Sequence, residues 1–223
     1  GRLVAQQLTE SLGQNFVVEN RAGAGGLIGS ELVAKSAPDG YSFVVSGIAS
    51  YVLAPAMSPT PTFDPVKDFT HVALFGGPPN IVIVNSALPV RTLQALLDYG
   101  KSRPDGLSYG SPGIGTVGHL AAELLKQTTG ARLEHIPYRG AALALTDVLG
   151  NQIPMAMITL TTASEQIRAG TVRALAMSAR NRLPDYPDLP TFPELGFPNL
   201  VATTWFALSG PANLPEEIVV KLN

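Results

Sequence analysis

The sequence alternates between segments with helical periodicity and short apolar segments that have the character of buried strands. Leu3, Val4, Leu8 and Leu12 recur at near-helical spacing, and Gly13 then supplies a left-handed helix end. The same rhythm predicts helices at 3–12, 29–36, 93–101, 118–128, 141–149 and 162–168. It predicts strands at 16–19, 41–46, 81–84, 107–110, 134–136, 153–158, 172–177 and 203–208. Strands separated by helices predict an α/β fold with mostly parallel sheets flanked by helices and joined by right-handed crossovers.

A Pro-rich segment at 183–198 interrupts this alternation. Its prolines leave too few backbone donors for regular structure, but its interleaved Leu, Tyr and Phe side chains favour packing over a floppy linker. We therefore expect an ordered connection over a surface. The strand predicted after it, at 203–208, would cross back to the first part of the chain.

Composition narrows the possible partners and chemistry. The 223 residues carry a net charge of −2 and only 14% charged side chains, so no basic face for nucleic acid is expected. The absence of Cys removes disulfides, thiolate metal sites and a cysteine nucleophile. No apolar run reaches the roughly 18 residues that a membrane helix needs. The chain length suits either one large α/β domain or two lobes of about 100 residues each.

Two glycine-rich loops each join a predicted strand to a predicted helix. The loop from Ser111 to His119 presents free N–H groups and the positive end of a helix dipole, which together favour an anion. Residues 19–26 form a similar loop, in which Arg21 is best explained by a pair with a neighbouring carboxylate. Neither loop has Walker or dinucleotide spacing. A turn of small residues is also an ordinary helix cap, so the binding hypothesis needs further support.

The three histidines show no metal-binding or catalytic spacing. His71, His119 and His135 lie far apart, without HExxH and without a Gly-x-Ser-x-Gly elbow. His119 is placed equally well to donate to a ligand or to satisfy a backbone carbonyl, whereas His71 and His135 are interpreted as structural. The enzyme alternative is a small α/β hydrolase or transferase that uses His119 with Ser111.

Six ordered motifs resemble the Bug/TctC family, the extracytoplasmic receptors of tripartite tricarboxylate transporters. They are Glu-Asn-Arg-Ala-Gly-Ala-Gly-Gly from Glu19, Ala-Pro-Asp-Gly-Tyr from Ala37, Asp-Pro-Val-Lys-Asp-Phe from Asp64, Ser-Pro-Gly-Ile-Gly-Thr from Ser111, His-Ile-Pro-Tyr-Arg-Gly from His135 and Thr-Trp-Phe from Thr204. The resemblance implies a two-lobed, type II-like Venus flytrap in the periplasm that hands a small carboxylate to membrane permease subunits. It implies no cofactor, no metal and no bond chemistry, and we expect a monomer. A ligand-sensing module for a signalling partner is the alternative within the same fold.

The resemblance also implies lobe boundaries and site residues. Lobe one is expected at 1–85 plus 201–223 and lobe two at 86–200. The ligand contacts implied for lobe two are Ser111, Gly113, Gly115, Thr116, His119, Tyr138, Arg139 and Thr159. Those implied for lobe one are Ala24, Gly25, Gly26, Ser50 and Tyr51.

This chain departs from the family pattern at its ends and after one strand. Relatives begin with a strand and a carboxylate-binding loop, whereas this chain starts within a helix, and we therefore expect the physical protein to be longer at both ends. Where many relatives carry an Asp after the strand at 153–158, this chain has Ile158 followed by Thr159. An ammonium group would lack its counter-charge there, which predicts a carboxylate ligand without an amino group.

Overall fold

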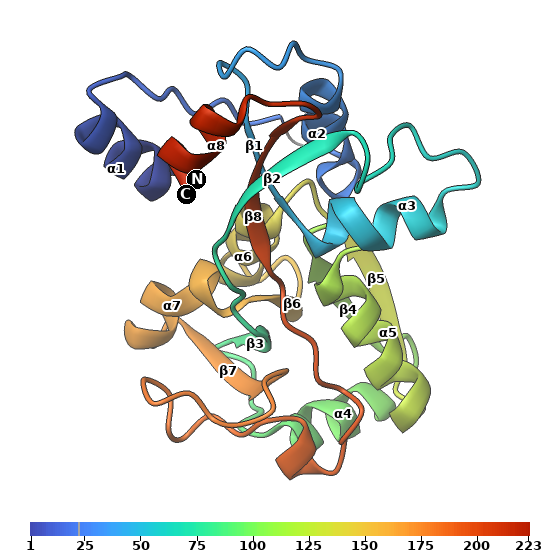
Figure 1. The fold of residues 1–223 in the computed structure, drawn as a ribbon. Coiled ribbons are helices and arrows are strands. Elements are labelled where there is room, and N and C mark those ends of the chain that lie inside the picture. The colour runs from blue at the N-terminus through green and yellow to red at the C-terminus, as the bar shows by residue number, and fades with distance from the viewer. Residues whose placement is uncertain (22) are drawn as a thin grey trace. The chain divides into compact units, whose positions relative to one another are not determined.

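The computed structural model describes residues 1–21 and 23–223, and these form two compact units. The first unit comprises Gly1–Gly76 with Trp205–Asn223, and the second comprises Gly77–Thr204 (Figure 1). The strand at 80–85, expected from the sequence in lobe one, lies in the second unit because it pairs there with strands on both of its sides. The return to the first unit likewise falls at Trp205, later than the expected residue 201.

The first unit is built on a three-stranded antiparallel sheet. The central strand β8 (Phe206–Pro211) lies between β1 (Val44–Gly47) and β2 (Phe69–Leu74). Its remaining elements are α1 (Arg2–Leu12), η1 (Ala24–Gly26), α2 (Leu27–Ala34), η2 (Ala49–Leu53), α3 (Ala54–Met57) and α8 (Glu216–Leu222). Two apolar clusters fill this unit, one around Tyr51 and Phe69 and the other around Val72 and Leu208.

The first helix confirms one prediction and its surroundings correct another. Helix α1 ends at Gly13, whose φ of 65° is the left-handed cap that the sequence predicted. The strand predicted at 16–19 does not form, because the N–H of Phe16 donates to Thr9 Oγ1 (3.0 Å) and Val17 is exposed. An apolar run alone therefore did not suffice to make a strand here.

The second unit is built on a five-stranded mixed sheet in the order β5-β4-β6-β3-β7. Strand β4 (Leu107–Ser111) runs parallel to β5 (Leu133–Pro137) and β6 (Met155–Thr159), whereas β3 (Asn80–Asn85) runs antiparallel to β6 and β7 (Val172–Met177). The predicted α/β class is confirmed. The predicted predominance of parallel pairing is wrong, because only two of the six pairings between described strands are parallel.

Helices cover both faces of this sheet. Strand β3 is buried along its whole length, and its alternate side chains enter two different cores. Val82 and Val84 pack with α4 (Leu93–Lys101) and α5 (Val117–Thr129), while Ile81 and Ile83 pack with α6 (Ala141–Leu149) and α7 (Leu160–Arg168). The apolar run at 81–84 is thus explained by burial on two faces.

The Pro-rich segment is an ordered connection, as the sequence predicted. Leu189 and Phe192 are buried in the cores of the second unit, and Pro193–Leu195 forms a short 3-10 turn, η3. The Arg182 guanidinium donates to Glu194, whose carboxylate also accepts from the Thr191 N–H (2.8 Å).

Every helix within 1–21 and 23–223 is too short or too polar to span a bilayer.

Candidate ligand-binding site

The loop between β4 and α5 lies at the carboxyl end of β4 and has a tightly determined backbone. Gly113 (φ 137°) and Gly115 (φ 75°) adopt conformations that favour glycine. Thr116 caps α5 by accepting from the His119 N–H (3.4 Å), and its hydroxyl donates to the Gly113 carbonyl (2.8 Å). The loop is therefore fixed by its own side chains before any ligand arrives.

Ser111 anchors this loop from below. Its side chain is fully buried, and its Oγ lies 2.7 Å from His135 Nε2 and accepts from the Gly113 N–H (3.2 Å). The sequence implied Ser111 and Thr116 as hydroxyl contacts for a ligand. In the structure both hydroxyls already have partners, Thr116 in the loop and Ser111 in the loop and His135, so their contribution is to hold the shape of the loop. Ser111 also pairs with His135, and not with His119 as the enzyme alternative required.

Three aromatic rings stack beneath the loop. Tyr109 stacks on His135 (4.9 Å between ring centroids), and His135 stacks on His119 (4.1 Å). His119 Nδ1 accepts from the Gly115 N–H (3.2 Å). Because a backbone N–H can only donate, Nδ1 carries no proton, and the neutral ring of His119 presents its proton on Nε2. The ring as a whole is half-buried.

Burial lowers the pKa of both histidines. Desolvation is the main cause that lowers the pKa of His119, and it lowers the pKa of His135 to about 4 with the charge of His119 as second cause. Glu123 faces the pair from α5; burial would raise its pKa, but hydrogen bonds from the Tyr109 hydroxyl (2.7 Å) and Lys126 outweigh this and hold the pKa below its usual value. Glu123 also forms an ion pair with Lys126, so the charges next to the two histidines sum to zero.

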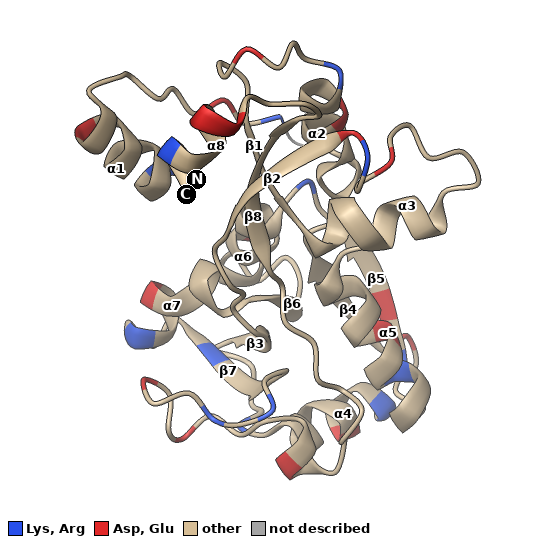
Figure 2. Ribbon diagram, viewed as in Figure 1, with Lys and Arg blue, Asp and Glu red and all other residues tan. Residues whose placement is uncertain are grey.

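The site offers dipoles in place of charged side chains. No Lys, Arg, Asp or Glu occurs between Ser111 and His119, and the first charges along α5 are Glu123 and Lys126, which neutralise each other (Figure 2). The N–H groups of Val117 and Gly118 belong to the first turn of α5 and have no partner one turn earlier. Together with Nε2 of His119, these donors suit a carboxylate at the carboxyl end of a parallel strand.

The other residues implied for lobe two have separate surroundings. The Tyr138 hydroxyl donates to Asp147 (2.6 Å), and burial together with Asp147 raises its pKa to about 12. The ring of Tyr138 is partly buried and packs against the core. The backbone N–H of Tyr138 donates to the Ser111 carbonyl (3.1 Å). Arg139 is exposed next to the start of α6. Thr159 lies at the end of β6, where its hydroxyl bonds Thr162 (2.9 Å).

In the first unit the second glycine-rich loop adopts an unusual backbone. Gly23, Ala24, Gly25 and Gly26 all have positive φ, and α2 begins at the next residue. A β-carbon on Gly26 would lie 3.4 Å from that of Ser50, so these two implied site residues are neighbours. Ala22 lies outside the described residues. Arg21 pairs with Glu19, the structural role that the sequence favoured.

Ser50 and Tyr51 have different environments although they are adjacent. Ser50 belongs to a buried row of three hydroxyls, in which Ser46 bonds both Ser50 and Ser30 (2.8 Å to Ser30). Tyr51 is 4% exposed and packs against Phe69, His71 and Trp205, and burial raises its pKa to about 12. Tyr51 is thus a core residue of the first unit. Ser50, at one end of this row of hydroxyls, lies next to Gly26 of the glycine-rich loop.

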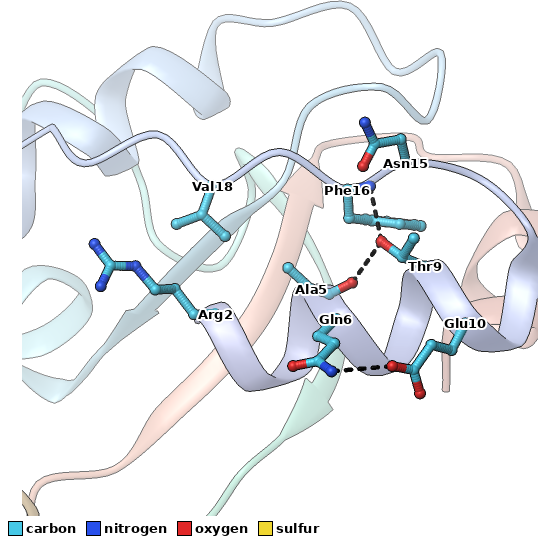
Figure 3. A pocket seen from close by; sticks show the side chains of 8 residues that line it. All are labelled: Arg2, Ala5, Gln6, Thr9, Glu10, Asn15, Phe16 and Val18. Carbon is cyan, nitrogen blue, oxygen red and sulfur yellow. Dashed lines mark hydrogen bonds between the residues drawn. The ribbon is translucent and has the colours of Figure 1, made fainter.

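A separate cavity of about 420 Å³ lies in the first unit between α1 and the segment that follows it (Figure 3). Three of its polar side chains already have partners, since Thr9 bonds Ala5 and Phe16, and Gln6 donates to Glu10 (3.0 Å). We do not regard it as the ligand site, because none of the residues that line it belongs to either glycine-rich loop.

Acidification is expected to destabilise the second unit through its stacked histidines. In the unfolded chain the imidazole of His135 titrates near pH 6.5, whereas its pKa in the folded chain is about 4. Between these two pH values the unfolded chain binds more protons than the folded chain. The free energy of unfolding therefore falls as pH falls. Urea unfolding at about pH 7.5 and pH 5 measures how much unfolding free energy is lost on acidification. This loss should be smaller for His135→Gln than for the wild type. The difference should be on the order of 1 kcal/mol, because each pKa unit corresponds to about 1.4 kcal/mol and solvent screens a half-buried ring. Equal losses would contradict this.

Sequence reasoning interpreted His135 as structural and did not reveal its contacts with Ser111 and His119. The signal that could have found it is the parallel pairing of β4 with β5, which sets Tyr109 opposite His135 and brings Ser111 within reach. That pairing joins residues far apart in the sequence, and no local pattern around His135 reveals it.

The family comparison covers the whole chain. Residues 1–223 match TctC, the tripartite tricarboxylate transporter family receptor. Protein BugT of Bordetella pertussis is 38% identical over 224 residues, which cover 100% of this chain and 68% of BugT. A protein from the tcbD-tcbE intergenic region of Pseudomonas sp. (strain P51) is 34% identical over 223 residues, covering 100% of this chain and 66% of that protein. The chain thus spans about two thirds of the length of these relatives.

Solved structures agree with the sequence match. An R. palustris protein with adipate superposes with a TM-score of 0.94 at 35% identity, covering 99% of this chain and 74% of that chain. MatC from Rhodopseudomonas palustris with bound malate gives 0.91 at 32% identity, covering 99% and 75%. The periplasmic binding protein BugD gives 0.93 at 34% identity, covering 99% and 74%. These neighbours confirm the predicted two-lobed α/β fold of periplasmic binding proteins.

Because the family match extends over all 223 residues and relatives above 30% identity align with the whole chain, this chain belongs to the tripartite tricarboxylate transporter family of receptors, which are solute-binding proteins and not enzymes.

Proposed function

We propose that this chain is a monomeric periplasmic receptor that captures a small carboxylate. It delivers this ligand to the membrane permease subunits of a tripartite tricarboxylate-type transporter. The observation that carries the proposal is the loop at 111–119, which combines the first N–H groups of α5 with a His119 ring whose Nδ1 is occupied by Gly115, and which contains no charged side chain. Family membership and the relatives recorded with adipate and malate support the same ligand class.

The ligand is proposed to lack an amino group. Strand β6 pairs with the parallel strand β4 through its first two residues, and it ends with the fully buried Ile158 and the partly buried Thr159. Thr159 bonds the hydroxyl of Thr162, so this edge holds neutral hydroxyls where a carboxylate would be needed to balance an ammonium group. An unpaired ammonium would have to be desolvated there without compensation, which disfavours amino acids.

Matched pairs of acids test the ligand class most directly. Succinate differs from aspartate, and glutarate from glutamate, only by the amino group. In the pair that binds better, we expect the full-length protein to bind the non-amino acid at least about tenfold more tightly than its amino counterpart. This ratio corresponds to about 1.4 kcal/mol of binding free energy. Calorimetric titration measures this ratio, and a thermal-shift panel that includes adipate and malate first selects the concentrations.

The two parts of the proposal have separate counter-results. A ligand at about 100 times its Kd should raise the free energy of unfolding by about 2.7 kcal/mol, which is several degrees of melting temperature. No shift with any carboxylate of the panel would overturn the receptor assignment. Tighter binding of aspartate or glutamate than of every non-amino acid would leave the receptor assignment intact and overturn the ligand class.

A further inference from the structure

His135 lies at the centre of the site without being available to a ligand through its Nε2. It comes from β5, and its ring fills the space between Tyr109 on β4 and His119 on α5, at 4.9 Å and 4.1 Å between centroids. Its Nε2 lies 2.7 Å from Ser111 Oγ. One side chain thus contacts both the start of the loop and the histidine that closes it.

The hydrogen-bond inventory assigns the direction of the Ser111–His135 bond. The Ser111 hydroxyl has one proton and two possible acceptors, His135 Nε2 at 2.7 Å and the Gly113 carbonyl at 3.2 Å. The Gly113 carbonyl already accepts from the Thr116 hydroxyl (2.8 Å). The serine proton is therefore best used by His135, which accepts on Nε2 and is left with its own proton on Nδ1.

This assignment links two ends of the same loop. Fixing Ser111 Oγ lets it accept from the Gly113 N–H, which sets the backbone that leads to Gly115. The Gly115 N–H in turn donates to His119 Nδ1 and selects the tautomer with the proton on Nε2. Stacking on His135 holds the plane of that ring. A change at His135 is thus transmitted to the donor that His119 offers.

We propose that His135 is a positioning residue of the ligand site, which holds the loop at 111–116 through Ser111 and orients His119 by stacking, so that Nε2–H of His119 meets a carboxylate oxygen of the ligand. This inference rests on the proposed receptor function for its ligand, and on the contacts of the ligand-free chain for its geometry.

Two substitutions separate the contributions of His135. His135→Phe keeps an aromatic ring between Tyr109 and His119 but removes the acceptor for Ser111, whereas His135→Gln keeps an acceptor near the position of Nε2 but removes the ring. Glu134→Gln is the matched control, because Glu134 is the preceding residue of β5, is exposed and therefore points away from the stack. Calorimetry with succinate, glutarate, malate and adipate measures the affinity of each full-length variant.

We expect His135→Phe to weaken binding about tenfold, the loss of roughly one buried hydrogen bond, and His135→Gln to retain binding within about threefold of the wild type. Glu134→Gln should match the wild type. Nitrogen-15 spectra of the imidazoles, recorded without ligand, should show the Nε2–H tautomer of His119 in the wild type and a mixture of tautomers in His135→Phe.

The spectra keep this inference distinct from the receptor proposal. If the wild type binds neither these four acids nor any other carboxylate of the panel, the receptor proposal fails, while the tautomer of His119 still reports whether His135 positions it. Wild-type affinity together with an unchanged His119 tautomer in His135→Phe would overturn the inference. Equal loss of affinity in Phe and Gln variants, with the His119 tautomer unchanged in both, would reduce His135 to a packing residue.

Discussion

Replacement of Gly118 by alanine is expected to abolish carboxylate binding and to lower the free energy of unfolding by about 3 kcal/mol or more. Gly118 lies in the first turn of α5, and a β-carbon there would approach the Met157 carbonyl oxygen on β6 to 2.3 Å. The obstacle is backbone of a fully buried strand, which cannot move aside as a flexible side chain could. Helix α5 would have to shift at the end that carries the proposed anion donors.

Gly150→Ala is the matched control for this prediction. Gly150 also belongs to the second unit, has a φ of −75°, and an added β-carbon would come no closer than 3.4 Å to any neighbour. Its effect should stay within about 0.5 kcal/mol. Unfolding in urea followed by circular dichroism, and calorimetry with the acid that binds the wild type best, measure both effects. A Gly118→Ala protein that binds this acid normally would show that the first turn of α5 does not contact it.

The second unit could be predicted well because its elements are marked by local patterns. The helices at 93–101 and 141–149 have the predicted bounds, as does the strand at 172–177. Each helix has one apolar face, and in α4 the side chain of Thr92 caps the first turn through the Ala95 N–H (3.1 Å). Periodicity and caps are properties of neighbouring residues, so they are visible in the sequence.

Strand pairing could not be predicted, because it depends on residues that lie far apart. Strand β2 escaped the sequence analysis, since its burial does not alternate, its register shifts between His71 and Ala73, and its partner β8 lies near the end of the chain. The direction of β3 was missed for the same reason. Its apolar run is equally compatible with parallel and antiparallel neighbours, and the structure has antiparallel ones on both sides.

The candidate site was half predictable on similar grounds. Its glycines, between a predicted strand and a predicted helix, identified the loop at 111–119 as a special turn, and the structure places the predicted residues Ser111, Gly113, Gly115, Thr116 and His119 together there. Residue types alone did not tell which hydroxyls hold the loop. That distinction depends on burial and on His135, which the sequence separates from Ser111 by another helix.

Replacement of Gly47 by alanine is expected to destabilise the first unit by about 3 kcal/mol or more. Gly47 ends β1 opposite Phe206, and an added β-carbon would lie 1.9 Å from the Trp205 carbonyl oxygen and 3.3 Å from the Phe206 backbone. The alanine would separate β1 from the central strand of its sheet. It would also disturb Ser50, whose hydroxyl donates to the Gly47 carbonyl (3.2 Å) and packs beside the glycine-rich loop.

Trp205, the only tryptophan of the chain, lies in the first unit and makes this effect measurable on its own. Its fluorescence should report unfolding of Gly47→Ala at a lower urea concentration, whereas Gly29→Ala should leave it unchanged or raise stability by up to about 1 kcal/mol. Gly29 lies inside α2, its φ is not in the positive region, and an added β-carbon would meet nothing closer than 3.7 Å. If Gly47→Ala unfolded like the wild type, β1 would have to pair with β8 less closely than the structure places it.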